Sequence, residues 1–302
     1  MLPALTEIAS GLLFPEGPIW LPDGSLIIVE LAAGTVSRIT LDGKKHVIAT
    51  PGGSPNGAAM GPDGLLYVCN SGGFSWERRD GLLWPGPQPK DYSGGRIERI
   101  NIETGKVEVL YNACGAYPLK GPNDIVFDAH GGFYFTDHGK RRERDLDCGA
   151  LYYARADGSL IRELVFPMTT ANGVGLSPDG KTVYVAETDT GRLWGFDIVM
   201  PGVIDRPAPL GGHLLEGPPG YTCFDSMAVE ANGNVCVAAL IQGGITVFAP
   251  DGRFVESVPM PDPLCTNICF GGTDLKTAYI TLSGSGRLVS MPWPRPGHPL
   301  KH

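Results

Sequence analysis

The sequence lacks the features of several protein classes. It contains no run of about 18 apolar residues, which excludes a predicted transmembrane helix. Its first residues, MLPALTEIASGLL, carry no basic stretch before an apolar core, so no secretory signal is predicted. Positive charge is scarce, and the formal net charge of −8 argues against nucleic acid as the principal partner. We therefore expect a cytoplasmic protein that binds neither membranes nor nucleic acids.

Several metal and nucleophile motifs are also missing. The seven cysteines include no Cys-x2-Cys pair, so we expect them to be small buried residues. No Gly-x-Ser-x-Gly elbow is present, although a Ser-His-Asp triad built from distant residues stays open. The one basic cluster, Lys140, Arg141, Arg142 and Arg144, is interrupted by Glu143 and is expected to be a solvent-exposed loop.

Glycine and proline are abundant, with 43 Gly and 27 Pro among 302 residues. Tight hairpin turns need positive φ, which Gly, Asp and Asn tolerate best, and pairs such as Asp63-Gly64 and Asp179-Gly180 follow short apolar runs. No long amphipathic helical pattern competes with these strands. Hydrophobic residues make up 42% of the chain, which is enough to fill a large core. The sequence therefore predicts an all-β fold.

A polar residue precedes a strand-like run six times, and in each copy the fourth residue after it is large and apolar. We call these six residues the anchors: Glu16, Asn56, Asn123, Asn172, Asp225 and Thr266. They are separated by 40, 67, 49, 53 and 41 residues, near the length of about 40 to 50 residues typical of a four-stranded propeller blade. Repeats arranged in a ring bring equivalent positions together in space. The anchors therefore form one candidate site.

This spacing predicts a six-bladed β-propeller with four-stranded antiparallel blades around a central channel, in a single domain over residues 1–302. The segment Leu5–Ser10 precedes the first unit, and the last unit needs an outer strand, so we expect the two termini to pair and close the ring. The longest step contains residues 71–95, which are either a surface loop or a lid over one end of the channel.

Five of the six anchors carry an oxygen that can bind a metal ion. Glu16 and Asp225 have carboxylates, whereas Asn56, Asn123 and Asn172 have amides. Two carboxylates balance the charge of a divalent cation, and amide oxygens complete its shell without adding charge. A single Asn or Asp before a strand is more simply explained as a turn cap. Recurrence at equivalent positions favours a shared site.

The same segments resemble the family of senescence marker protein, gluconolactonase and regucalcin. The resemblance is carried in order by PEGPIW with Glu16, PNDIVFD with Asn123 and Asp124, ANGVGLSPDGKTVYVAET with Asn172, and FDSMAVEANGNV with Asp225. It extends over nearly the whole chain. It implies a propeller with one divalent cation, Ca²⁺, Mn²⁺, Mg²⁺ or Zn²⁺, in the channel.

In this resemblance, Glu16, Asn172 and Asp225 correspond to the metal ligands, and Asn123 and Asp124 correspond to the substrate-contacting pair of the third blade. Animal members hold the sugar with an Arg two residues before that Asn, but this chain has Gly121, next to Lys120.

Four further residues have a place in the expected site. We expect Asn56 and Tyr221 to contact substrate as well. The aromatic side chains of Trp76 and Trp84 either face a sugar or pack against the protein.

These residues lead to a functional hypothesis. The chain is expected to be a metal-dependent hydrolase that opens a sugar lactone to the aldonic acid in carbohydrate metabolism, with Asp225 both a metal ligand and the base that accepts a proton from water. The alternatives are a phosphotriesterase-like propeller hydrolase and a calcium-binding or interaction propeller without catalysis. The sequence does not distinguish among lactones or metals, and it is silent on oligomeric state.

Overall fold

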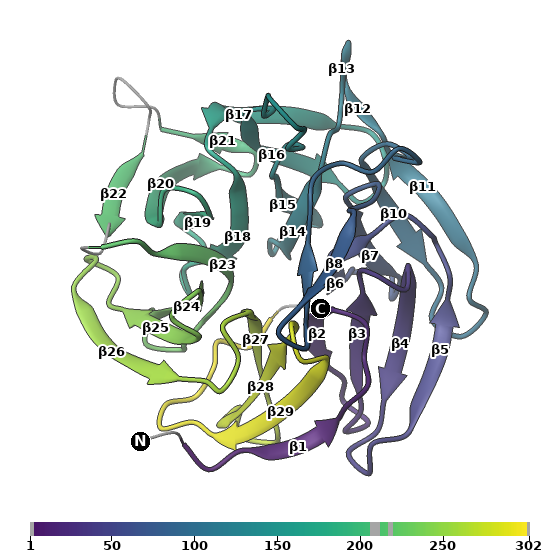
Figure 1. The fold of residues 1–302 in the computed structure, drawn as a ribbon. Helices are drawn as coiled ribbons and strands as arrows, with labels where there is room; N and C mark the ends of the chain where they lie inside the picture. The colour runs from purple at the N-terminus through teal and green to yellow at the C-terminus, as the bar shows by residue number, and fades with distance from the viewer. Residues whose placement is uncertain (1–2, 206–211, 217–219, 301–302) are drawn as a thin grey trace.

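Six antiparallel sheets form a ring in the computed structural model, which describes residues 3–205, 212–216 and 220–300 (Figure 1). None of the described residues lies in an α-helix, so this part of the chain has no helix that could cross a membrane. The predicted six-bladed β-propeller is confirmed.

Each blade uses its first strand as the innermost one. The innermost strands are β2 (Pro15–Trp20), β6 (Pro55–Met60), β14 (Pro122–Phe127), β18 (Ala171–Leu176), β23 (Cys223–Val229) and β27 (Cys265–Gly271). The second strands are β3 (Leu26–Glu30), β7 (Leu66–Asn70), β15 (Gly132–Asp137), β19 (Thr182–Glu187), β24 (Val235–Leu240) and β28 (Thr277–Leu282). The third strands are β4 (Thr35–Ile39), β10 (Arg96–Ile100), β16 (Gly149–Arg155), β20 (Arg192–Met200), β25 (Gly244–Phe248) and β29 (Arg287–Pro292).

The outer strands complete the blades and close the ring. They are β5 (Lys45–Ala49), β11 (Val107–Tyr111), β17 (Ile161–Met168), β26 (Phe254–Pro259) and β1 (Thr6–Ala9), and in blade 4 the short β21 (Val203–Ile204) and β22 (His213–Glu216) share the outer edge of β20. Strand β1 pairs with β29 of the last blade, with Thr6 opposite Ser290. The expected closure by the two ends of the chain is confirmed, and it covers an edge that would otherwise offer unpaired backbone groups.

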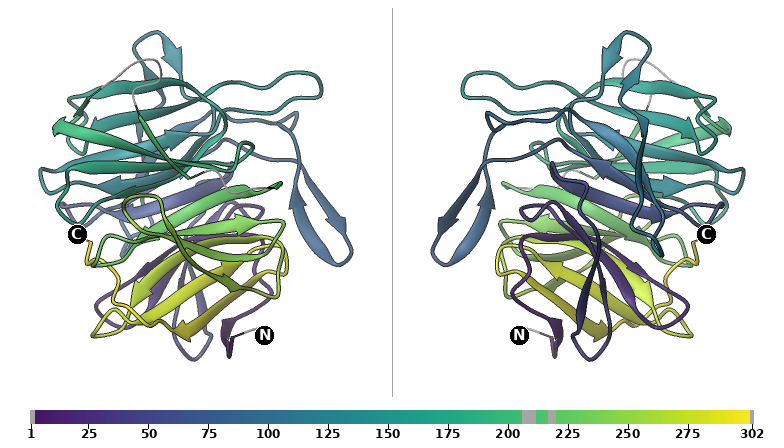
Figure 2. Two further views of the ribbon diagram at one scale, coloured as in Figure 1. Left: turned by 90° about the vertical axis from the view of Figure 1, so that its left-hand side faces the viewer. Right: turned by 90° about the vertical axis from the view of Figure 1, so that its right-hand side faces the viewer.

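Two small hairpins extend beyond the blades. Strands β8 (Trp76–Arg79) and β9 (Leu82–Pro85) form one within residues 71–95, and β12 (Ala113–Cys114) with β13 (Tyr117–Pro118) forms the other. Figure 2 shows the β8–β9 hairpin standing on one face of the ring.

The core lies between neighbouring sheets. Alternating apolar side chains of adjacent blades interdigitate, and the rings of Tyr67, Phe127 and Phe133 join blades 2 and 3 with centroids 4.9 to 5.6 Å apart. Burying such a side chain contributes roughly 1.5 to 3 kcal/mol. Packing on both faces keeps each sheet in place and fixes the inner strands around the axis.

Every inner strand has a register shift at its anchor. The shifts lie between Glu16 and Ile19, Pro55 and Ala58, Pro122 and Ile125, Ala171 and Val174, Phe224 and Met227, and Cys265 and Asn267. Such an irregularity bends a strand and re-aims its side chains. The repeat seen in the sequence is therefore also a repeat of backbone geometry.

Candidate metal and active site

The anchors lie at the starts of the inner strands, and these strands contact one another in order around the ring, β2 to β6, β14, β18, β23 and β27 and back to β2. Antiparallel pairing places the end of each second strand beside the same edge, as Pro55 lies opposite Asn70. We call this edge of the ring the anchor end. All the anchors except Asp225 are buried, and Glu16, Asn123 and Asn172 are only 2%, 4% and 4% exposed.

Neighbouring inner strands approach very closely after the anchors. A Cβ at Gly57 would lie 2.5 Å from the carbonyl oxygen of Asn123, and one at Gly173 would lie 2.6 Å from that of Asp225. Backbone atoms cannot yield to such a contact, so these positions require glycine. The close approach brings anchors from different blades to one place.

Asp124 occupies the equivalent position in blade 3, where it links two blades. Its carboxylate accepts the N–H of Ile125 at 2.9 Å and the N–H of Val174 in blade 4 at 3.2 Å. Burial, with the negative charge of Glu16 adding to it, raises the pKa of Asp124 to about 7.

Glu16 and Asp225 share this electrostatic environment. Burial raises the pKa of both carboxyls, and for Asp225 the charges of Glu16 and Asp124 raise it further. Glu16 accepts the N–H of Gly17 at 2.8 Å and the side-chain N–H of Asn267 at 2.7 Å. Asp225 keeps partial exposure, so it is the site carboxylate that water can reach.

Two buried amide oxygens at the site have no hydrogen-bond partner. They are Oδ1 of Asn123 and Oδ1 of Asn172, and the Asn172 amide nitrogen donates to Thr188 Oγ1 at 2.9 Å. A buried acceptor without a partner costs about 1 to 3 kcal/mol. Such atoms are therefore expected to have a ligand in the working protein.

These donors fit a hard divalent cation. Crowded carboxylates with raised pKa values and unpartnered amide oxygens both gain from a positive ion, and all are oxygen ligands. In the described part of the chain, no group of three or more His, Cys, Asp or Glu side chains could hold a metal ion. Any metal at the anchor end must therefore use the mixed set of carboxylates and amides.

A second set of polar residues binds the backbone just before the anchors. We call Glu30, Asn70, Asp137 and Glu187, each the last residue of a second strand, the brace residues. Each accepts a backbone N–H from the segment just before an anchor, from Leu13 (2.9 Å), Ser54 (3.1 Å), Lys120 and Gly121 (both 2.7 Å), and Thr169 (2.6 Å) respectively. In blade 5 the last residue of the second strand is Leu240, which has no side-chain acceptor.

The carboxylates of the brace residues are used within the protein. Asp137 and Glu187 bond to backbone rather than offering free oxygens, since Asp137 also accepts the N–H of Gly139 at 2.8 Å. Their role is structural.

Other predicted residues take different positions. Asn56 is buried at the start of β6, but Tyr221 is 70% exposed and lies outside the buried set. Thr266 bonds to the hydroxyls of Thr281 and Ser283, and it is the next residue, Asn267, that reaches Glu16. Sequence reasoning missed Asn267 because it is displaced by one position from the repeat.

The position of the missing Arg is closed to larger side chains. A Cβ at Gly121 would lie 2.6 Å from the carbonyl oxygen of Gly139. The neighbouring Lys120 is exposed, and its backbone N–H is bound by Asp137. The backbone at Gly121 therefore cannot accommodate the substrate-binding Arg of animal members.

Two expectations about exposure were wrong. Lys140, expected in a solvated loop, is only 1% exposed because residues 71–95 pack over it. Cys148 is exposed, and Cys114 and Cys269 are only partly buried, whereas the other four cysteines are buried as expected.

Comparison with known proteins connects this geometry to a family. The family model described as SMP-30/gluconolactonase/LRE-like region matches residues 14–284. Lactonase drp35 from Staphylococcus saprophyticus is 30% identical over 258 residues, which cover 84% of this chain and 72% of the relative.

Solved structures of the same shape include a gluconolactonase from Xanthomonas campestris, with a TM-score of 0.76 and 22% identity over 96% of this chain and 89% of that one. Regucalcin from Agrobacterium tumefaciens, described as a calcium-binding protein, has a TM-score of 0.72 and 18% identity over 98% of this chain and 95% of that one. At these identities the likeness shows the fold.

Proposed function

The chain belongs to the SMP-30/gluconolactonase/LRE-like family, and from that membership we propose that it is a divalent-metal-dependent hydrolase that opens a sugar lactone to the aldonic acid. One observation carries the proposal. The electrostatically coupled carboxylates of Glu16 and Asp225 and the unpartnered oxygens of Asn123 and Asn172 all belong to inner strands at the anchor end. A purely structural ring has no need of unsatisfied oxygens beside crowded acids.

Glu16, Asn172 and Asp225 would hold the cation. When bound, such an ion would polarise the lactone carbonyl as a Lewis acid. Asn267 fixes Glu16 by its hydrogen bond of 2.7 Å, and Thr188 fixes the amide of Asn172 at 2.9 Å. Both contacts orient ligand oxygens before substrate arrives, as hydrogen bonds to ligand side chains do in metal sites.

Asp225 is the proposed general base. Its raised pKa makes it a better proton acceptor than an ordinary carboxylate, and its partial exposure gives water access. The water oxygen bonds to the carbonyl carbon as Asp225 takes the proton. The ring C–O bond then breaks, and the proton passes to the departing ring oxygen, which yields a hydroxy acid.

Asn123 and its neighbours are proposed to orient the substrate. The free Oδ1 of Asn123 can accept a hydrogen bond from a substrate hydroxyl. Asp124 has both carboxylate oxygens bound to backbone N–H groups, so its larger contribution is to hold β14 against β18. Asn56 borders the same site from blade 2.

The test is turnover of a lactone panel by wild type and Asp225→Asn. Protein treated with a chelator is assayed against pentono- and hexono-lactones after adding back Ca²⁺, Mn²⁺, Mg²⁺ or Zn²⁺. We expect hydrolysis to depend on metal and to fall about 10²- to 10⁴-fold in Asp225→Asn. Unchanged turnover in the variant would remove the proposed base. Faster hydrolysis of a phosphotriester than of every lactone would favour the phosphotriesterase alternative, and metal binding without any turnover would favour a calcium-binding propeller.

A further inference from the structure

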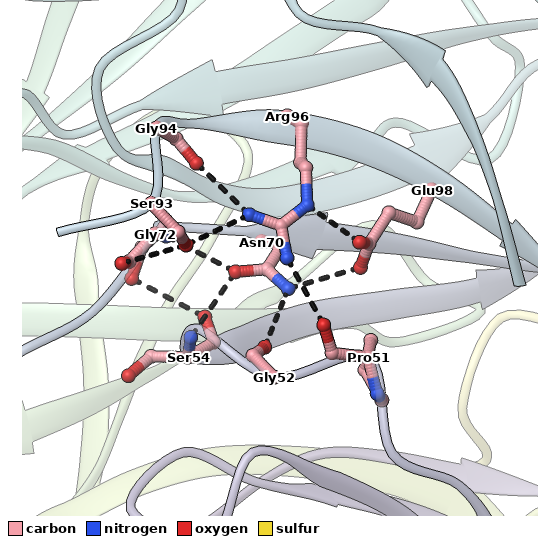
Figure 3. A network of polar contacts seen from close by, with 10 residues as sticks. Pro51, Gly52, Ser54, Asn70, Gly72, Ser93, Gly94, Arg96 and Glu98 are labelled. Carbon is pink, nitrogen blue, oxygen red and sulfur yellow. Dashed lines mark hydrogen bonds and ion pairs between the residues drawn. The ribbon is translucent and has the colours of Figure 1, made fainter. Parts of the chain in front are cut away.

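Residues 71–95, which we call the arm, leave blade 2 at the anchor end and are tied at their base by a polar network (Figure 3). Asn70 Oδ1 accepts the N–H of Gly72 at 3.0 Å, and the carbonyl of Gly72 accepts the N–H of Ser93 at 2.9 Å. Arg96 donates to Ser93 Oγ at 3.1 Å and to Glu98 at 2.5 Å. The two ends of the arm are thereby fixed to each other.

The far end of the arm reaches other blades. The N–H of Leu83 donates to the carbonyl of Gly284 in blade 6 at 2.8 Å. The ring of Trp76 lies 5.1 Å from that of Phe14, two residues before the anchor Glu16. Figure 2 shows the β8–β9 hairpin over this face. The arm therefore forms a wall beside the candidate site.

A buried lysine from blade 3 holds the arm on its other side. The ammonium of Lys140 donates to the carbonyl of Gly73 at 2.7 Å and lies 3.8 Å from the ring centroid of Phe74, with the ring of Tyr92 at 5.6 Å. All three partners belong to the arm. A buried cation is costly unless its partners compensate, and here a carbonyl and two aromatic faces do so.

The charges that act on Lys140 come from the end of β15 and the loop that follows it. Asp137 and Asp147 act on the ammonium through their charge, while burial lowers the pKa of Lys140 to about 7. Asp147 forms an ion pair with Arg142 at 2.9 Å, and Arg142 also donates to Gln88 of the arm at 3.4 Å. The hydrogen bond and the ring contacts of the Lys140 ammonium are therefore all with the arm.

We propose that Lys140 is a positioning residue that clamps the arm against blade 3, and that the clamped arm makes the site select compact lactones over bulky ones. The contacts of the arm run from Lys140 to Phe14 and Gly284, and in this proposal a large ring substituent would have to displace them to enter. The selectivity part of this inference rests on the proposed lactonase function, whereas the clamp does not.

The experiment compares wild type, Lys140→Met and Lys140→Arg, with Arg144→Met as the control. Arg144 is an exposed cation of the same loop, so its replacement removes the same charge without touching the arm. Hydrogen exchange is followed in residues 71–95, and kcat and KM are measured for δ-valerolactone and a phenyl-substituted δ-valerolactone. Phe74→Leu weakens the clamp from the arm side, in case Lys140→Met folds poorly.

We expect Lys140→Met to speed exchange in the arm about tenfold, and to reduce the preference for the compact lactone about tenfold through KM of the bulky one. Lys140→Arg should retain most of the preference, and Arg144→Met all of it. Unchanged exchange in both Lys140→Met and Phe74→Leu would overturn the clamp. Faster exchange with an unchanged preference would overturn the selectivity role. If wild type hydrolyses sugar lactones but neither valerolactone, only the selectivity role is overturned. If it hydrolyses no lactone at all, the proposed function fails together with the selectivity, and the exchange data still test the clamp.

Discussion

The anchors and the brace residues are two sets of polar side chains on the same end of the same propeller, yet they differ in how well their hydrogen bonds are satisfied. Among the braces, Asp137 accepts three backbone N–H groups at 2.7 to 2.8 Å. Among the anchors, Asn123 and Asn172 leave an oxygen without a partner, and Asp225 is crowded by other carboxyls. The braces therefore stabilise the fold. The anchors keep oxygens free to bind a ligand, and these unpartnered oxygens lower the stability of the fold.

The largest effect expected from the anchors is on activity. Glu16→Gln keeps the size of the side chain but removes one of the two carboxylates proposed to balance a cation. We expect kcat/KM for a lactone to fall about 10³-fold, since one of the proposed metal ligands is lost. The free energy of unfolding, measured in urea without metal, should stay constant or rise because a buried charge has gone. A large loss of stability would place Glu16 with the braces instead.

The anchor end should also make stability depend on pH. Since the pKa of Asp124 is about 7 in the fold and 3.8 is its ordinary value, the folded chain holds a proton that the unfolded chain has lost between those limits. The free energy of unfolding of metal-free protein should therefore fall as pH rises from about 4 to 7, by as much as about 4 kcal/mol at 1.36 kcal/mol per pKa unit.

Urea denaturation at a series of pH values measures this slope, and Asp124→Asn provides the comparison because it cannot titrate. The variant should flatten the dependence. An identical slope in both proteins would assign the effect to other groups.

Replacing a brace residue should have the opposite effect to replacing an anchor, since it should lower stability more than activity. Asp137→Ala leaves the N–H groups of Lys120, Gly121 and Gly139 without their acceptor. At about 1 kcal/mol for each bond, we expect the free energy of unfolding to fall by about 3 kcal/mol. Thermal and urea denaturation measure this, with the exposed Asp145 changed to Ala as a control. A stable Asp137→Ala that loses only metal affinity would make Asp137 part of the site.

The smallest expected effect is at the brace of blade 4. Glu187→Gln retains an acceptor for the N–H of Thr169 and for the hydroxyl of Thr190, now 2.6 and 2.7 Å from the carboxylate. Only the negative charge that strengthens these hydrogen bonds is lost. We therefore expect the free energy of unfolding to fall by about 1 kcal/mol and turnover to change less than threefold. A loss of turnover as large as that of Glu16→Gln would erase the distinction between the two sets.

The sequence predicted the ring and most of its inner residues because one signal recurs. Each anchor stands at the start of a strand, so the repeat alone places Glu16, Asn123, Asn172 and Asp225 on one end of the propeller. The second strands and their turns followed from alternating apolar residues and Asp-Gly pairs. Pairing of the two ends of the chain followed from counting strands.

The hydrogen-bond partners of the braces and the burial of the clamp could not be predicted from the sequence, for different reasons. Glu30, Asn70, Asp137 and Glu187 follow their anchors by 14 or 15 residues, a spacing that could have revealed them, but their partners are backbone groups that only the fold places. Lys140 sits in a charged run that is typical of solvated loops, and its burial depends on where residues 71–95 pack. Long-range packing of irregular segments has no periodic signal.

The central claim is that anchors from different blades form one cation site, and Mn²⁺ binding measured by titration calorimetry tests it most directly. We predict that chelator-treated wild type binds a single equivalent of Mn²⁺, and that the double variant Glu16→Gln, Asp225→Asn binds none while remaining folded. Binding of Mn²⁺ by the folded double variant with the same stoichiometry and affinity as wild type would contradict the account.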